Sequence, residues 1–297
     1  MFCQNNKDLQ KNLDAKQGGL CFSILMAFYV ILAFVVQSIL LSFTEKDSFL
    51  YLAVCSSLSS LSIFGVIIYI RLHKKVKLDI KNKVKSFKPK YLVFSALLSV
   101  GMFLGLGFIN LKINQMLIGL GLKTSAPAVM VENMWQFLFF TITLAVLPAI
   151  FEEIFFRGIL LNSFGEKNTF LSVLTVSFCF ALYHCNLSQF VYQFVYGVAF
   201  SFVAIACKSI LPCIISHFLN NFIVLLFYFI DVSVNLYSIL LIIIGLVSLA
   251  LLVLMIVLEL KNKKLLSKQK GLCRQFVVYA LFGIFICLLM IVSALLV

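Results

Sequence analysis

Two adjacent carboxylates stand within a long apolar stretch of the chain. Glu152 and Glu153 interrupt the run LAVLPAIFEEIFFRGILL, and Arg157 follows one helical turn later. Ionisable groups at membrane depth cost on the order of 2.5–3.5 kcal/mol each, and they are rare unless they face a protein interior or a wet cavity. A carboxylate held beside a water molecule can act as the general base of a hydrolysis. Three such groups within six residues therefore indicate a functional site.

The spacing of these residues assigns them different surroundings. Pro148 precedes them by one turn and is expected to kink or open the helix, because it removes one backbone hydrogen bond. Glu153 and Arg157 are four residues apart, so they share a helix face and can form an ion pair. Glu152 lies about 100° further round the helix and has no partner on its own segment. An unpaired carboxylate at this depth is expected to carry a proton or to bind a cation.

The chain has three histidines, and two of them fall in apolar segments of the same predicted four-helix region as these glutamates. His73 lies in a basic loop and is expected to be solvated. His184 ends the run FCFALYHCN, and His217 lies in ILPCIISHFLNNF. His217 and Asn221 are four apart and present one face, whereas Asn220 is rotated away and is expected to hydrogen-bond to a neighbouring helix.

Depth supports a single internal site. At about 1.5 Å per residue from the predicted cytoplasmic ends, Glu152 and Asn221 lie about 16 Å deep, His217 about 10 Å and His184 about 22 Å. These depths agree within the uncertainty of helix boundaries. We therefore expect four polar groups from three helices to meet in the cytoplasmic half of the membrane.

The residue types narrow the chemistry of that site. Two neutral imidazoles and a carboxylate form a known ligand set for catalytic zinc, so Glu152, His184 and His217 are predicted ligands of zinc or another divalent metal. Glu152 can also activate a water that the histidines hold without a metal. The amide of Asn221 can donate to a developing oxyanion. Cys185 points about 100° away from its neighbour His184, which disfavours a thiol nucleophile, and no HExxH motif is present.

Composition sets the fold class. Hydrophobic residues make up 63% of the 297 residues, charged residues 12%, and the mean hydropathy is +1.10. Apolar windows of about 20 residues, enough for one bilayer crossing, recur along the chain. Helices are the expected form because their backbone bonds are satisfied within each segment. We predict an all-α, polytopic transmembrane bundle of about nine spans, with the site in the central four helices. The spans are at about 20–43, 49–70, 91–109, 134–161, 169–186, 190–207, 210–230, 236–259 and 275–297.

The basic residues that give the net charge of +13 are distributed unevenly between the two sides of the predicted membrane topology. With nine spans, 21 of the 24 Lys and Arg residues fall on one side, and only Lys46, Lys112 and Lys123 fall on the other. The positive-inside rule then places the N-terminus in the cytoplasm and the C-terminus outside, in a multi-pass protein of the cell membrane. Anionic lipid is a secondary partner of this charge, and nucleic acid is not expected to be one. The nine cysteines include no CxxC pair and are interpreted as small buried side chains.

Three segments are predicted along the chain. Residues 1–130 hold N-terminal spans and a basic cytoplasmic loop, residues 131–230 the core with the polar residues, and residues 231–297 a C-terminal pair of spans. The stretch 110–133 is either an interfacial or re-entrant segment or an ordinary connector. The first 19 residues are polar and do not form a cleavable signal peptide.

Three short motifs, in order, resemble a known family. Glu-Glu-x-x-x-Arg at 152–157, Phe-x-x-x-His at 180–184 and His-x-x-x-Asn at 217–221 look like the CAAX protease and bacteriocin-processing (CPBP, or Abi) family of intramembrane proteases. That family includes the type II CAAX prenyl endopeptidases. The resemblance covers roughly residues 134–228. It implies an intramembrane endopeptidase in which Glu152 activates water and His184 helps to hold that water or a metal. It further implies that His217 and Asn221 complete the site.

The resemblance also gives Glu153 and Arg157 supporting roles. It permits substrates such as prenylated C-terminal peptides, bacteriocin or pheromone leaders, and membrane anchors. The Lys-, Asn- and Phe-rich composition suits an AT-rich bacterium, which favours a membrane-associated peptide or protein precursor. The alternatives are a non-catalytic immunity or scaffold protein and an ion- or proton-coupled transporter.

Overall fold

The computed structural model describes residues 13–73, 88–122, 131–165, 170–230, 238–261 and 270–296. All regular structure in these ranges is helical, which confirms the predicted all-α class. The elements are α1 (Ala15–Leu40), α2 (Phe49–His73), α4 (Lys90–Gly119), α5 (Met134–Phe140), η1 (Thr141–Val146), α6 (Leu147–Glu152), η2 (Glu153–Leu160), η3 (Leu161–Phe164), α7 (Phe170–Tyr183), α8 (Leu187–Cys207), α9 (Leu211–Phe229), α10 (Ile239–Leu260) and α11 (Lys270–Leu296).

Eight helical segments in these ranges are long and apolar enough to cross a membrane, as a polytopic bundle requires. One of them is the composite helix Met134–Phe164, which runs from α5 through η3. The predicted span at 169–186 corresponds to the shorter apolar helix α7, which has 14 residues and ends at Tyr183. The chain is therefore a multi-pass helical membrane protein.

Some sequence predictions concern residues that the structure does not describe. Most of the two basic loops, at 74–87 and 262–269, lies outside the described residues, as do residues 1–12. Of the stretch 110–133, the first ten residues continue α4 to Gly119, and residues 123–130 lie outside the described ranges. The division into three segments stays a prediction.

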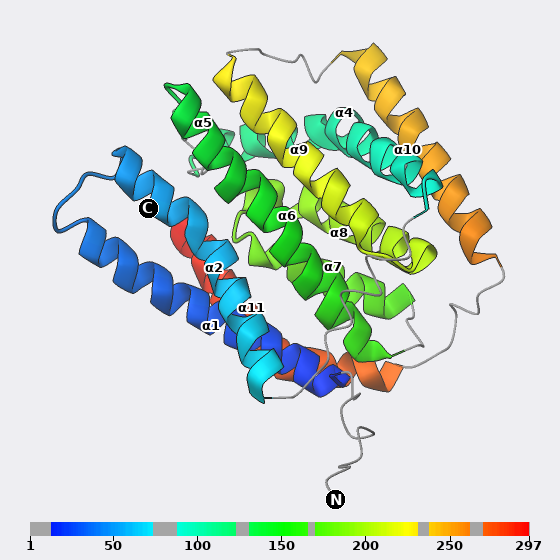
Figure 1. Cartoon of the computed structure of the whole chain (residues 1–297), viewed down its shortest axis with the longest axis horizontal. Helices are drawn as coiled ribbons and strands as arrows, with labels where there is room; N and C mark the ends of the chain where they lie inside the picture. The colour runs from blue at the N-terminus through cyan, green and yellow to red at the C-terminus, as the bar shows by residue number, and fades with distance from the viewer. Residues whose placement is uncertain are drawn as a thin grey trace, which may run out of the picture.

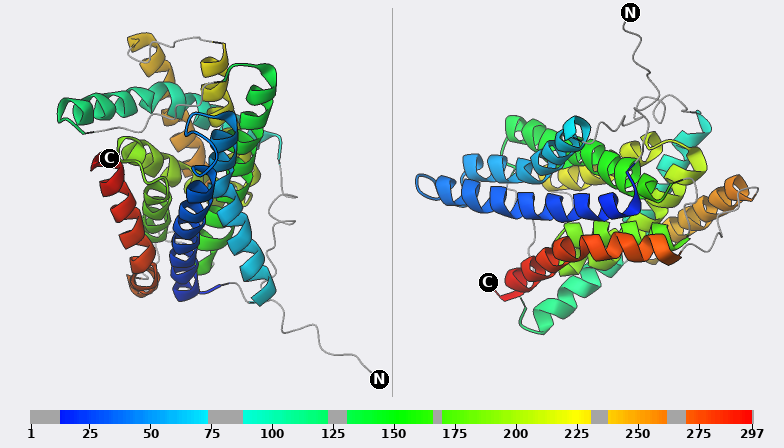
Figure 2. Two further views of the ribbon diagram at one scale, coloured as in Figure 1. Left: turned by 90° about the vertical axis from the view of Figure 1, so that its left-hand side faces the viewer. Right: turned by 90° about the horizontal axis from the view of Figure 1, so that it is seen from below.

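The composite helix and α9 form the middle of the bundle (Figure 1). On one side, α1, α2 and α11 pack together, and α2 contacts η1 and α6. On the other side, α4 and α10 pack against each other and against α8, and Figure 2 (left) shows α4 crossing the direction of α1 at a wide angle. This arrangement encloses α6 and η2, the segments that carry the two glutamates.

The composite helix departs from α-helical geometry around Pro148. Before the proline, η1 is π-helical, and the Leu147 amide bonds to the Ile142 carbonyl five residues back. Pro148 has no amide hydrogen to give to the Leu144 carbonyl, the usual acceptor one α-helical turn earlier. Nδ2 of Asn221 in α9 donates to that carbonyl instead, at 3.1 Å. A second π-helical segment, η2, starts at Glu153, so Glu152 lies between the two π-helical segments and Glu153 is the first residue of the second.

Helices α7 and α8 form an antiparallel hairpin. The rings of Phe170 and Phe202 stack near its open end, so both helices have one terminus at that end of the bundle. The turn adopts a left-handed backbone at Cys185, with φ of 48°. Asn186 then caps α8 by accepting from the amide and hydroxyl of Ser188. The hairpin thus returns the chain to the end of the bundle at which α7 begins. The cytoplasmic location of the N-terminus stays a prediction.

The outer helix pairs pack closely through small residues. In α4 and α10, a Cβ added at Gly245 would overlap the backbone of Gly105. In α1 and α11, Ser23 Oγ donates to the Tyr279 carbonyl at 2.8 Å and accepts from the Gly283 amide at 3.1 Å. Small residues of this kind let membrane helices approach closely, where packing rather than hydrophobic burial drives association.

We predict that Gly245→Leu destabilises the bundle by about 1–3 kcal/mol, because the added side chain has no space between α4 and α10. The measurement is the midpoint of thermal unfolding of the purified chain in detergent. Gly119→Leu is the matched control, since nothing lies within 4 Å of a Cβ there. Equal midpoints for the two variants would contradict the close packing of α4 and α10.

Candidate active site

Three side chains from three elements converge inside the bundle. Glu152 ends α6, His184 follows α7, and His217 lies in α9. Nε2 of His184 and Nε2 of His217 each lie 3.9 Å from Oε2 of Glu152. The side chains of Glu152 and His217 are 6% and 5% exposed, and that of His184 is 18% exposed. The structure thus brings together three of the four residues that the sequence placed in a catalytic site.

The hydrogen bonds of both imidazoles fix which ring nitrogen faces Glu152 as an acceptor. Nδ1 of His184 lies 2.8 Å from the Phe180 carbonyl oxygen, which can only accept, so Nδ1 carries the hydrogen. Nδ1 of His217 lies 2.9 Å from Oε1 of Glu153 and donates to that carboxylate. A neutral imidazole has one donor and one acceptor nitrogen, so Nε2 of each ring presents a lone pair.

The point where these atoms meet therefore needs a donor. Oε2 of Glu152 is buried and has no hydrogen-bond partner among the described residues. Two imidazole lone pairs and a carboxylate oxygen face one another there, and buried acceptors are normally satisfied. A water molecule, a proton or a cation fits between such atoms. A single water can bridge polar groups that are too far apart for a direct bond.

A buried ion pair supports His217 from the opposite side. The Arg157 guanidinium donates to Oε1 of Glu153 at 2.9 Å, which confirms the predicted pair. The same oxygen accepts from Nδ1 of His217. Glu153 therefore neutralises Arg157 and holds the His217 ring in the orientation that directs Nε2 toward Glu152.

Arg157 makes further contacts that the sequence did not predict. Its side chain is almost fully buried, with the guanidinium carbon 4.3 Å from the Phe180 ring centroid and 5.0 Å from that of Phe200. It also donates to the Gly197 carbonyl at 3.3 Å. A Cβ at Gly197 would lie 3.0 Å from Cβ of Ser177. A lone glycine inside an apolar helix was the only sequence signal for this close approach.

The two asparagines of α9 serve different neighbours. Asn220 accepts from the Tyr192 hydroxyl of α8 at 2.9 Å, which confirms its predicted bond to a neighbouring helix. Asn221 uses Nδ2 to hold the Leu144 carbonyl beside Pro148. Because an amide nitrogen carries two hydrogens, this bond leaves Asn221 chemically able to donate a second one. Its predicted oxyanion contact stays a prediction.

The remaining candidates lie away from this point. His73, the last residue of α2, is exposed and stacks on Tyr69, as expected of a solvated residue. The Cys185 thiol faces Met290 of α11, at 3.6 Å between the sulfur atoms. The prediction that Cys185 is not a nucleophile stays a prediction.

The three predicted metal ligands lie slightly farther apart than the ligands of a tetrahedral zinc site. A tetrahedral zinc with bonds of about 2.0–2.1 Å places its ligand atoms about 3.3 Å apart. The two 3.9 Å separations at Glu152 are wider, and within the described ranges no group of three His, Cys, Asp or Glu residues is arranged to hold a metal ion. The donor types suit a divalent ion, and the two separations are about 0.6 Å wider than those of a tetrahedral zinc site, so the metal stays a proposal.

Comparison with known families gives one match. Residues 134–223 match the family model of the type II CAAX prenyl endopeptidases, Rce1-like. The predicted resemblance to the CAAX proteases is confirmed over this segment. No curated protein and no solved structure matched the chain.

The Rce1-like segment covers about a third of the chain and contains every residue that the sequence placed in the site. It begins at the start of α5 and ends within α9, so it spans the composite helix, the α7–α8 hairpin and the helix of His217. At this coarse level, the match supports a membrane-embedded protease of the CAAX type.

We predict that Arg157→Met destabilises the Rce1-like segment by about 3–5 kcal/mol, because it leaves the buried Glu153 carboxylate without its cation. The double variant Glu153→Gln/Arg157→Met removes both charges and is expected to recover part of the loss. Thermal unfolding of both variants in detergent measures this difference. A double variant less stable than Arg157→Met alone would show that the ion pair is not the cause.

Proposed function

We propose that this chain is an intramembrane endopeptidase that hydrolyses a peptide bond of a membrane-associated peptide or protein precursor. The observation that carries the proposal is the meeting of three acceptor atoms, from Glu152, His184 and His217, at a buried point that suits a water molecule. The family match over the same segment supports a proteolytic use of that water.

In the proposed reaction, Glu152 takes one proton from the water as general base. The other hydrogen of the water is donated to Nε2 of His184 or of His217, which orients the water, and the water oxygen attacks the carbonyl carbon of the substrate. The carbonyl oxygen becomes an oxyanion, to which the second amide hydrogen of Asn221 donates. Glu152 then returns the proton to the leaving nitrogen as the carbon–nitrogen bond breaks, which yields a carboxylic acid and an amine.

Glu153 and Arg157 act one step removed from the water. Glu153 fixes the donor nitrogen of His217, and Arg157 balances the charge of Glu153 through their ion pair. They are positioning residues in this scheme. The adjacent glutamates therefore have separate roles, because only Glu152 lacks a cationic partner on its own segment.

The proposed substrate class rests on the setting of the site. The matched family is named for endopeptidases that act on prenylated CAAX proteins. For this chain, we favour a peptide or protein precursor held in the bilayer, as the bacterial type of composition suggests. The membrane location brings such a substrate to the same depth as Glu152.

We predict that Glu152→Gln lowers the cleavage rate by about 10²–10⁴-fold, because an amide cannot accept the proton of the water. The assay reconstitutes the chain in vesicles with candidate membrane-bound precursor peptides and detects products by mass spectrometry. Glu45→Gln, at an exposed glutamate outside the Rce1-like segment, is the matched control. Unchanged cleavage by a folded Glu152→Gln variant would end the endopeptidase proposal.

We also propose, separately, that zinc or another divalent ion binds at Glu152, His184 and His217. Such an ion would polarise the attacking water as a Lewis acid. If this is right, a strong chelator lowers activity at least about tenfold and zinc restores it, while elemental analysis finds one ion per wild-type chain. Full activity in the chelator, without bound metal, would refute the metal site and leave the Glu152 mechanism standing.

A further inference from the structure

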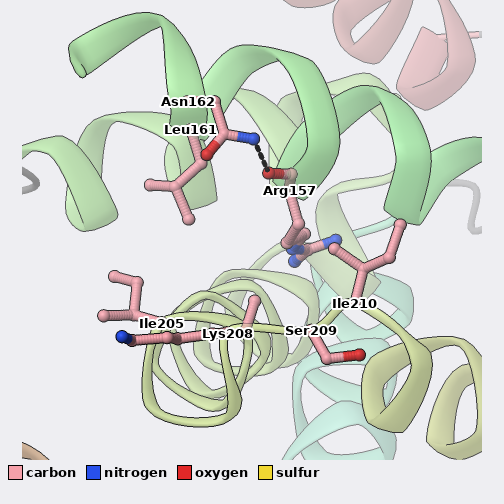
Figure 3. Close-up of a pocket in the computed structure, with 8 residues that line it drawn as sticks. Arg157, Leu161, Asn162, Ile205, Lys208, Ser209 and Ile210 are labelled. Carbon is pink, nitrogen blue, oxygen red and sulfur yellow. Dashed lines mark hydrogen bonds between the residues drawn. The ribbon is translucent and has the colours of Figure 1, made fainter. Parts of the chain in front are cut away.

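A cavity of about 230 Å³ lies between the end of the composite helix and the turn that joins α8 to α9. Figure 3 shows Arg157, Leu161 and Asn162 along one side, with Lys208 and Ser209 across the gap. Neither Glu152, His184 nor His217 lines it. The cavity is therefore separate from the Glu152 site, and Arg157, which pairs with Glu153, is among the residues that line it.

Arg157 supplies an unused donor at the buried end of this cavity. Two of its three nitrogens are committed, one to Glu153 and one to the Gly197 carbonyl. Its Nε is buried and has no hydrogen-bond partner among the described residues. A buried guanidinium donor of this kind favours an oxygen of an anion, because such charge-assisted hydrogen bonds are the strong ones.

The cavity lies at the level where three membrane helices end. The composite helix ends at Phe164, α8 ends at Cys207 and α9 begins at Leu211. A helix long enough to cross the hydrocarbon has its termini near the lipid headgroups. The phosphate groups of phospholipids are the anions present in high concentration at that level.

The remaining lining suits a lipid rather than a free ion alone. Leu161, Ala204 and Ile210 give apolar surface beside the buried guanidinium. Lys208 is exposed at the opposite side and adds a second cation. It ends α8 in a left-handed conformation with φ of 52°, a backbone that costs energy for a residue other than glycine.

We propose that this cavity binds the phosphate group of an anionic phospholipid, with Arg157 at the buried end and Lys208 at the exposed end. The apolar side chains contact the glycerol and the first methylenes of the acyl chains. The inference does not depend on the proposed endopeptidase activity, because it rests on the cavity, its cations and its level in the bundle.

Native mass spectrometry of the full chain in mild detergent tests the proposal. The probes are dioleoyl phosphatidylglycerol, dioleoyl phosphatidylcholine and inorganic phosphate, each added at the same concentration. We expect the wild-type chain to retain phosphatidylglycerol about tenfold more than phosphatidylcholine, because the choline cation is unfavourable beside two basic side chains. Competition by inorganic phosphate would show that phosphate alone is enough, which also supports the proposal.

Two cavity variants and two matched controls make the test specific. Lys208→Gln removes the outer cation and Ala204→Phe fills the space, and each is expected to lower phosphatidylglycerol retention about tenfold. Lys261→Gln at the end of α10 and Val195→Phe on the exposed side of α8 are the controls, because neither residue lines the cavity. If Ala204→Phe fails to fold, Lys208→Gln decides. Equal retention by the folded cavity variants and the controls, or equal retention of both lipids, would overturn the proposal.

Discussion

The polar interior depends on one carboxylate oxygen, Oε1 of Glu153, which accepts from both Arg157 and His217. Burying an unpaired charge in a bundle of this hydropathy is strongly unfavourable. The shared oxygen resolves that problem for Arg157 and at the same time assigns the hydrogen of His217 to Nδ1. As a result, Nε2 of His217 is left as an acceptor facing Glu152. The proposed reaction at Glu152 therefore takes place next to Glu153, whose charge is already balanced by Arg157.

Backbone irregularities are concentrated around the converging side chains. Glu152 lies between two π-helical segments and Glu153 begins the second, and π-helical turns often mark functional positions in helices. Pro148 lacks the amide hydrogen for the Leu144 carbonyl, and a side chain from another helix supplies a donor. Cys185 adopts a left-handed conformation directly after His184. Such features persist only where surrounding structure holds them, and here close packing of the outer helices encloses them.

Much of this organisation could be predicted from the sequence. The four-residue spacing of Glu153 and Arg157 indicated their pair, and the polar residues of three apolar segments indicated one shared site. The sequence could not show that His217 bonds to Glu153, because tertiary packing decides which face of the composite helix meets α9. It also could not identify the Gly197 and Leu144 carbonyls as acceptors, since every residue has a carbonyl and only tertiary packing selects one. The predicted span ended at residue 186, three residues past the end of α7, which is within the usual spread of boundaries predicted from sequence.

The partial exposure of His184 gives the site a direction. Of the three converging side chains, that of His184 is the most exposed, at 18% against 6% for Glu152 and 5% for His217. The opposite flank is closed by η2, where both Glu153 and Arg157 are buried. In the proposed function, a substrate would approach from the side of His184, at the short turn between α7 and α8. The width and orientation of that turn would act as a selectivity filter, admitting some polypeptide shapes before any catalytic group is reached.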